Sequence, residues 1–196
     1  MKYDRTTRWL HAGLALMVLV QLFSSLLMVV PEPGRVPTQP GAALFQLHRW
    51  SGITVVCLLL LHWLWQLSGH LANGWGHLFP WFSRRRMDRL MADLKSLPDW
   101  LRNGFPDQQK ETLPMAGAVH GLGLLTVTAM AVTGGTIFFA MTPDGGMTPM
   151  VRTIAEIHSF IANFMWAYLF GHAGIAVLHQ WRESPLISDM FNLIRK

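Results

Sequence analysis

The chain has 196 residues, of which 51% are hydrophobic and only 14% are charged, and it contains nine tryptophans. This composition excludes an ordinary soluble domain of the same size and indicates a membrane protein. The formal charge of +5 does not indicate a nucleic-acid partner, because the positive residues are concentrated in a few segments between and beside apolar stretches.

Four apolar stretches are long enough to cross a hydrocarbon core of about 30 Å. They cover roughly residues 9–30, 47–67, 115–140 and 154–181. A segment that crosses lipid must satisfy its backbone hydrogen bonds internally, so we expect four helices. The sequence therefore predicts an all-α fold, an integral membrane four-helix bundle that forms a single domain over residues 1–196.

Positive residues predict the orientation of these spans. They precede the first span, follow the fourth, and are frequent in the connection of residues 70–113 between the second and third. The two remaining connections hold only Arg35, Arg49 and Arg152. By the positive-inside rule, both termini and the 70–113 connection are cytoplasmic. We expect a multi-pass protein of the bacterial inner membrane, with lipid as a constant partner.

The first half of the chain places three histidines in or beside these spans. His11 lies about one turn inside the first span, at its cytoplasmic end. Segment 31–46 is rich in Pro and Gly, which predicts an outer loop without regular structure. The second span opens with LHRWSG, so His48 is near the outer surface, and His62 follows fourteen residues later at the cytoplasmic depth.

The connection of residues 70–113 contains apolar residues at helical spacing with Arg and Asp between them, which predicts an amphipathic surface helix. These apolar residues are Met87, Leu90, Met91, Leu94 and Leu101. The third span follows and carries His120 two turns from its cytoplasmic end. A short outer turn with Asp144 and Gly145 then leads into the fourth span.

The fourth span carries His158 and His172, and ionisable groups at that depth need a functional reason. Fourteen residues span about 21 Å of helix and return to within roughly 40° of the starting direction, so the two side chains share a face at two depths. Because successive spans alternate in direction, the topology gives an outer pair, His48 with His158, and an inner pair, His11 with His172.

Two imidazoles on opposite faces of a planar macrocycle are the ligands of a b-type heme, whereas zinc or copper needs three or four converging ligands. Ligands about 21 Å apart cannot share one metal ion. The chain has no CxxCH motif and Cys57 is its only cysteine, so any heme is held non-covalently. The sequence therefore predicts two b hemes, each with two histidine ligands, which favours electron transfer over oxygen binding.

The motifs LHAG, LHRWSG and IHSFIANFMWAYLFGHAG resemble the prokaryotic cytochrome b561 family and the related cytochrome b subunits of nickel-iron hydrogenases and formate dehydrogenases. The resemblance covers nearly the whole chain. It implies four ligands to heme iron, which are His11, His48, His158 and His172. His62 and His120 then lie beside the ligands. The resemblance selects His172 over His179, although the depth of His179 is more similar to that of His11.

The leading hypothesis is a di-heme cytochrome that exchanges electrons between the quinone pool and a donor or acceptor on the periplasmic side. Two alternatives rest on the resemblance: a superoxide oxidase with quinone as acceptor, and the membrane subunit of a larger hydrogenase or dehydrogenase complex, as the segment DLKSLPDWLRNG suggests. The sequence does not decide whether the protein is itself a quinone-linked oxidoreductase. A His-lined metal or proton transporter is an alternative of another class, but it needs more polar groups at mid-membrane than Asn163 and Tyr168.

Two arginines adjoin the expected outer ligands. Arg49 directly follows His48, and Arg152 precedes His158 by six residues. We expect these charges to neutralise the carboxylates of a heme or, with Arg35, to steer an anion toward it, an effect that salt screens over about 10 Å. The exact ligand at the inner site stays open between the predicted histidines and the rivals His62, His120 and His179.

Overall fold

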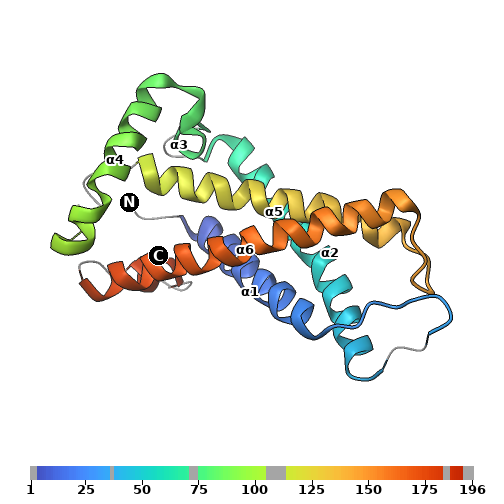
Figure 1. Cartoon of the computed structure of the whole chain (residues 1–196). Coiled ribbons are helices and arrows are strands. Elements are labelled where there is room, and N and C mark those ends of the chain that lie inside the picture. The colour runs from blue at the N-terminus through green and yellow to red at the C-terminus, as the bar shows by residue number, and fades with distance from the viewer. Residues whose placement is uncertain (1–3, 36–37, 71–74, 105–113, 183–185, 192–196) are drawn as a thin grey trace. The chain divides into compact units, whose positions relative to one another are not determined.

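The structure is a computed structural model that describes residues 4–35, 38–70, 75–104, 114–182 and 186–191 (Figure 1). Its helices, in chain order, are α1 (Arg5–Leu27), α2 (Gly41–Trp65), the π-helical turn η1 (Gln66–His70), α3 (Trp75–Leu78), the 3-10 turn η2 (Pro80–Phe82), α4 (Arg84–Asn103), α5 (Pro114–Ala140), α6 (Pro149–Arg182) and α7 (Leu186–Phe191). The described residues form no β-strand, only an isolated bridge between Glu32 and Arg35. The prediction of an all-α fold is confirmed.

Four helical segments are long and apolar enough to cross a membrane, namely Arg5–Leu27, Gly41–Ser68, Pro114–Ala140 and Pro149–Trp181. Large apolar side chains are exposed on them, such as Phe139 at 81% and Phe170 at 69%. A surface of this kind is suited to lipid, in which helices also satisfy their own backbone. The four predicted spans are therefore present, and the chain is a multi-pass membrane protein.

The start of α2 differs from the prediction. The helix begins at Gly41 rather than near residue 47, and the backbone N–H groups of Ala42 and Leu44 donate to the carbonyls of Thr38 and Pro40. A proline is compatible with a helix start, because its missing N–H would have no partner there in any case. The expectation of irregular structure throughout 31–46 was therefore wrong for residues 41–46, where GAALFQ is helical.

The chain forms two compact units. The terminal unit consists of Met1–Trp9, Leu64–Leu125 and Ala167–Lys196, and the central unit consists of Leu10–Trp63 and Thr126–Trp166. The four long helices α1, α2, α5 and α6 each contribute one segment to each unit. Residues that are distant in sequence therefore meet within each unit.

Polar contacts join α1 to α2 and α2 to α5 in the central unit. The Gln21 side-chain amide of α1 donates to the His48 carbonyl of α2 at 2.6 Å. Near the other end of this segment of α2, the Trp63 indole N–H donates to the Thr128 hydroxyl of α5 at 3.2 Å. Polar side chains in apolar helices commonly join neighbours in this way, since lipid offers no other partner.

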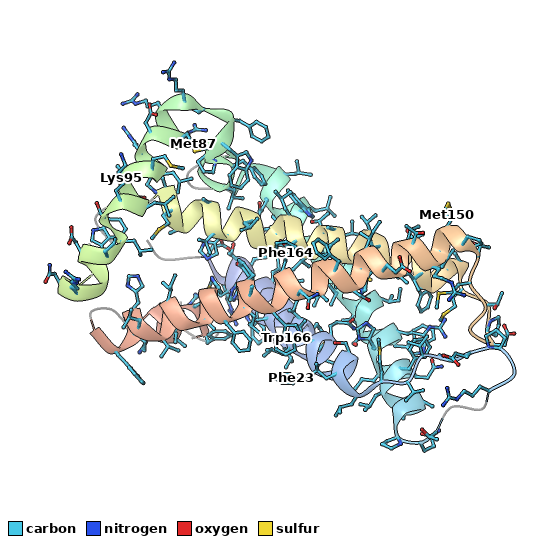
Figure 2. The ribbon with its side chains drawn as sticks, viewed as in Figure 1. Phe23, Met87, Lys95, Met150, Phe164 and Trp166 are labelled. Atoms are coloured by element: carbon cyan, nitrogen blue, oxygen red, sulfur yellow. The ribbon has the colours of Figure 1, made fainter. Side chains whose placement is uncertain are left out.

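The remaining two contacts close this arrangement. The Thr133 hydroxyl of α5 lies 2.8 Å from the His158 ring of α6. Figure 2 shows Phe23 of α1 beside Trp166 of α6, where the two rings meet edge to face with centroids 5.6 Å apart. Each of the four helix segments thus contacts two others, so the central unit is a four-helix bundle.

In the terminal unit, the segment from α3 to α4 packs against the beginning of α5. A Cβ atom at Gly121 of α5 would overlap the Leu78 carbonyl, so glycine is required for this close approach. The Asp93 carboxylate of α4 accepts a hydrogen bond from the Met115 N–H at 3.0 Å, in the first turn of α5. Figure 1 shows α4 beside this turn. The predicted amphipathic helix is present, with Leu90 buried.

Candidate functional site

The central unit brings together His48 of α2 and His158 of α6. Their ring centroids are 6.5 Å apart and the ring planes meet at 85°. Two imidazoles on opposite sides of one metal, with bonds of about 2 Å each and the ring radius added at both ends, would have centres roughly 6 Å apart. The observed separation therefore leaves room for one metal atom between the rings.

Hydrogen bonds determine which ring nitrogen of His48 carries the proton. The Nδ1 atom lies 3.1 Å from the Ser24 hydroxyl and 3.2 Å from the Gln21 carbonyl oxygen, both on α1. The Ser24 hydroxyl donates its own proton to that carbonyl at 3.1 Å. Both neighbours are therefore acceptors, so Nδ1 carries the proton and Nε2 keeps its lone pair for a metal.

His158 is held in the same form by α5. Its Nδ1 atom lies 2.8 Å from the Thr133 hydroxyl oxygen. The Thr133 hydroxyl donates back to its own helix, with the carbonyls of Ala129 and Met130 at 2.8 and 3.2 Å. With the Thr133 proton directed at these carbonyls, Nδ1 of His158 is the donor, which leaves Nε2 for a metal. Metal-binding histidines are commonly oriented by such a bond from the other nitrogen.

Both histidines line a pocket within the central unit, with about 1130 Å³ of empty space including its open mouth. The polar side chains in its wall are Gln21, His48, Arg49, His158 and Ser159, and five methionines line it: Met28, Met130, Met141, Met147 and Met165. The described wall contains no acidic side chain. Such a mainly apolar pocket with a few convergent polar groups is typical of a cofactor site.

Two glycines of α5 line the pocket beside His158. A Cβ atom at Gly134 would lie 3.0 Å from the Cε1 atom of His158, closer than an ordinary contact, whereas one at Gly135 would meet nothing within 4 Å. Glycine at these positions allows the His158 ring to lie against the helix and leaves space beside it. The space at Gly135 is therefore open to a group bound in the pocket.

The structure distinguishes the two arginines that were expected beside the outer ligands. Arg49 lines the pocket, with its guanidinium 4.7 Å over the Phe138 ring and 5.7 Å over the Phe45 ring. Its Nε atom is buried and has no hydrogen-bond partner among the described residues. A heme propionate would satisfy this donor. Arg152 is exposed in the first turns of α6 and is not part of the described pocket wall.

A bare metal ion fits this site less well than a heme. Within the part of the chain that the structure describes, no three His, Cys, Asp or Glu side chains converge as an isolated ion would require. Two opposed imidazoles are sufficient only where a macrocycle supplies the remaining ligands. The residues of the central unit therefore fit heme iron.

The terminal unit contains a second histidine cluster. The rings of His120 on α5 and His172 on α6 have centroids 5.5 Å apart and planes at 72°. Tyr168 stacks on His172, with centroids 5.3 Å apart and planes at 8°, and a Cβ atom at Gly123 would overlap the Tyr168 ring. His179, the rival from the sequence, is buried in the same unit.

A profile of the family described as prokaryotic cytochrome b561 matches residues 2–193, nearly the whole chain. The chain belongs to the prokaryotic cytochrome b561 family. It is accordingly a membrane b-type cytochrome of electron transfer that binds b-type heme. No curated protein and no solved structure matches the chain.

The remaining histidines that the cytochrome b561 resemblance concerns are divided between the two units. His11 and His62 belong to the central unit, but neither is part of the described pocket wall. His172 belongs to the terminal unit. The pairing of His11 with His172 joins residues of different units and stays a prediction, as does the role of His62 beside a ligand.

Sequence reasoning did not identify Gln21, Ser24 and Thr133, which hold the two histidines of this cytochrome from neighbouring helices. Each lies in an apolar span, with Ser24 beside Ser25 and Thr133 before two glycines, and none forms a ligand-binding motif. One general signal was available, because a polar side chain inside a membrane span seeks a partner on an adjacent helix. That signal gives no partner, however, until the rotation of each helix about its axis is known.

Proposed function

We propose that the protein is a di-heme b-type cytochrome that carries electrons across the bacterial inner membrane, between the quinone pool and a donor or acceptor on the periplasmic side. The observation that supports this most directly is the His48–His158 pair, with ring centroids 6.5 Å apart and both Nδ1 atoms engaged by hydroxyl groups. A heme held by both His48 and His158 would have no open position for oxygen, which favours electron transfer over oxygen binding.

A heme held by this pair supplies a one-electron iron couple whose potential depends on burial and hydrogen bonding. The chain's own residues provide both. Ser24 and Thr133 fix the imidazole rings, and the apolar pocket wall limits the access of water. Arg49 offers its buried Nε–H group as a donor to a propionate.

We infer a second heme on His172, with His11 as its other ligand, as the family resemblance implies. His120 is the alternative second ligand, because its ring lies next to that of His172, although the 5.5 Å between the centroids is shorter than the roughly 6 Å of two imidazoles on one metal. His62 stays a candidate beside the inner heme. Two hemes at the two depths of the fourth span would give electrons a path between the membrane surfaces.

One observation favours a second candidate function, the cytochrome b subunit of a larger hydrogenase or dehydrogenase complex. The helix α4 has 20 residues, with Pro98 inside it, and its exposed side chains include Arg84, Arg85, Lys95 and the apolar Met91 (Figure 2 labels Lys95). A charged helix of this length, beside the first turn of α5, offers a docking face to a soluble subunit. Superoxide oxidation with quinone as acceptor is a third alternative, which would use the same hemes.

Absorption spectra of the purified protein, before and after dithionite, test the proposal. We expect a sharp reduced α-band, a b-type pyridine hemochrome, two hemes per chain, and heme reduction by a quinol analogue. A protein without heme would contradict the proposal, and one heme per chain would reject its di-heme form. Purification from native membranes as a complex with a soluble redox subunit would favour the second candidate.

A further inference from the structure

We propose that Ser24 and Thr133 are positioning residues for the heme of the His48–His158 pair. Each hydroxyl, from a helix that supplies no ligand to this pair, holds one axial imidazole in its Nδ1-protonated form and so sets heme affinity and reduction potential. This inference rests on the proposed function, because it requires a heme at the pair.

The two hydroxyls occupy equivalent places in two matching networks. Ser24 of α1 contacts Nδ1 of His48 on α2, and Thr133 of α5 contacts Nδ1 of His158 on α6. Each hydroxyl donates to a carbonyl three residues earlier on its own helix, that of Gln21 at 3.1 Å or of Met130 at 3.2 Å, and Thr133 also to that of Ala129 at 2.8 Å. The same two carbonyls also hydrogen-bond the imidazoles. The arrangement recurs although the surrounding sequences share no motif.

The network at His48 is held firmly by its neighbours. Ser24 is only 4% exposed. The Gln21 side-chain amide lies 2.6 Å from both the His48 carbonyl and the Ser51 hydroxyl, which fixes this part of α1 against α2. A Cβ atom at Gly52 would be in ordinary contact with that amide at 3.5 Å. Because Ser24 cannot turn toward water, its oxygen stays directed at the ring.

The chemical effect of each hydroxyl follows from the direction of its hydrogen bond. A donor bond from Nδ1–H to an acceptor raises the basicity of the opposite nitrogen, Nε2. A more basic axial ligand stabilises ferric iron relative to ferrous iron, so the reduction potential falls. Loss of the hydroxyl leaves the Nδ1–H group only the backbone carbonyl as acceptor, so the potential should rise and heme binding should weaken. Loss of Thr133 should have the larger effect, because its contact is 2.8 Å long against 3.1 Å for Ser24.

The experiment compares Thr133→Val and Ser24→Ala in the full-length protein, with Thr133→Ser as the conservative variant. Two neighbouring hydroxyls serve as matched controls, because within the described part of the chain they bond only backbone carbonyls of their own helices: Thr136, which donates to Val132, and Ser25, which donates to Leu22. Thr136→Val and Ser25→Ala therefore remove a similar bond without touching a ligand. Midpoint potentials of both hemes and the rate of heme transfer to apomyoglobin are measured.

In Thr133→Val and Ser24→Ala we expect the potential of one heme to rise, with heme loss about 10–100-fold faster, while the other heme is unchanged. Thr133→Ser and both controls should behave as wild type. Unchanged potentials in Thr133→Val and Ser24→Ala, with both hemes bound, would overturn the inference and leave the di-heme proposal intact. Equal shifts in Thr136→Val would also overturn it, as a nonspecific effect of losing a hydroxyl.

A second Thr133 variant and the heme content of the wild-type protein complete the test. If Thr133→Val does not fold, Thr133→Ala removes the hydroxyl with less crowding and is expected to give the same rise in potential. A wild-type protein without heme would overturn the proposed function together with this inference. The two failures are therefore distinguishable by the heme content of the wild-type protein.

Discussion

The two histidine clusters of this cytochrome are held in different ways. In the central unit, the rings of His48 and His158 are 6.5 Å apart, and each Nδ1 faces a hydroxyl from another helix. In the terminal unit, the rings of His120 and His172 are 5.5 Å apart, and Tyr168 stacks on His172. The first pair borders an open pocket, whereas the second is packed among aromatic side chains.

This difference shows that two histidines at the same depth in the membrane need not be ligands of the same metal. The space beside the ring and the partner of its second nitrogen matter as much. His48 and His158 satisfy both conditions within one unit. His120 is close to His172, but the rings are nearer to each other than the roughly 6 Å that two imidazoles on one metal require.

The largest expected effect is the loss of one heme when a ligand is removed from either cluster. His158→Ala should remove the heme of the central unit and leave the other, and His172→Ala should do the reverse, because a single remaining imidazole leaves iron one axial ligand short. Heme content per chain, measured by pyridine hemochrome, should fall by half in each variant. Two hemes in either purified variant would contradict the assignment.

The next comparison decides between the two candidate partners of His172. We expect His11→Ala to lose the second heme and His120→Ala to keep both, with at most a shift in potential. The measurement is heme content, together with the redox titration of the remaining heme. If His120→Ala loses a heme and His11→Ala does not, the packed cluster of the terminal unit is itself the ligand pair.

The aromatic packing of the terminal unit predicts a smaller effect, on stability. A Cβ atom in Gly123→Ala would overlap the Tyr168 ring and force it from its place on His172. Such overpacking costs about 1–3 kcal/mol. Gly171→Ala on α6 is the control, because a Cβ atom there meets nothing within 4 Å. Thermal unfolding in detergent should show a lower midpoint only for Gly123→Ala, and equal midpoints would show that the Tyr168 stack is not rigid.

The smallest expected effect concerns the two arginines. Arg49→Gln removes a positive charge from the pocket and should lower the potential of the adjacent heme by on the order of 40 mV, equivalent to about 1 kcal/mol for one electron. Arg152→Gln is the matched control, because Arg152 is exposed and lies outside the described pocket wall. Redox titration of both variants measures the shifts. Equal shifts in the two variants would mean that the distance of an arginine from the pocket does not affect the heme potential.

Much of the fold could be predicted from the sequence, because length and apolarity leave a lipid-spanning segment no alternative to a helix. Alternating span directions also predicted that His48 and His158 share a depth, and the structure places their rings together. The early start of α2 was missed, since GAALF follows a proline and reads as part of a loop. Such boundaries depend on weak local preferences.

The rotation of each helix about its axis was harder to predict. Depth alone placed Arg152 near the outer ligand, yet six residues at 100° each turn its side chain about 120° away from His158. The contact between Thr133 and His158 depends on the mutual rotation of α5 and α6, which no motif records. Residues that act through a ligand, such as Ser24, therefore emerged only from the structure.

An iron-edge anomalous scattering map of crystals of the purified protein tests the central claim most directly. We predict an iron peak between His48 and His158, with the Nε2 atoms of both rings directed at it and their Nδ1 atoms still bonded to Ser24 and Thr133. An iron peak elsewhere in the central unit, or iron bound through Nδ1 of either ring, would contradict the account.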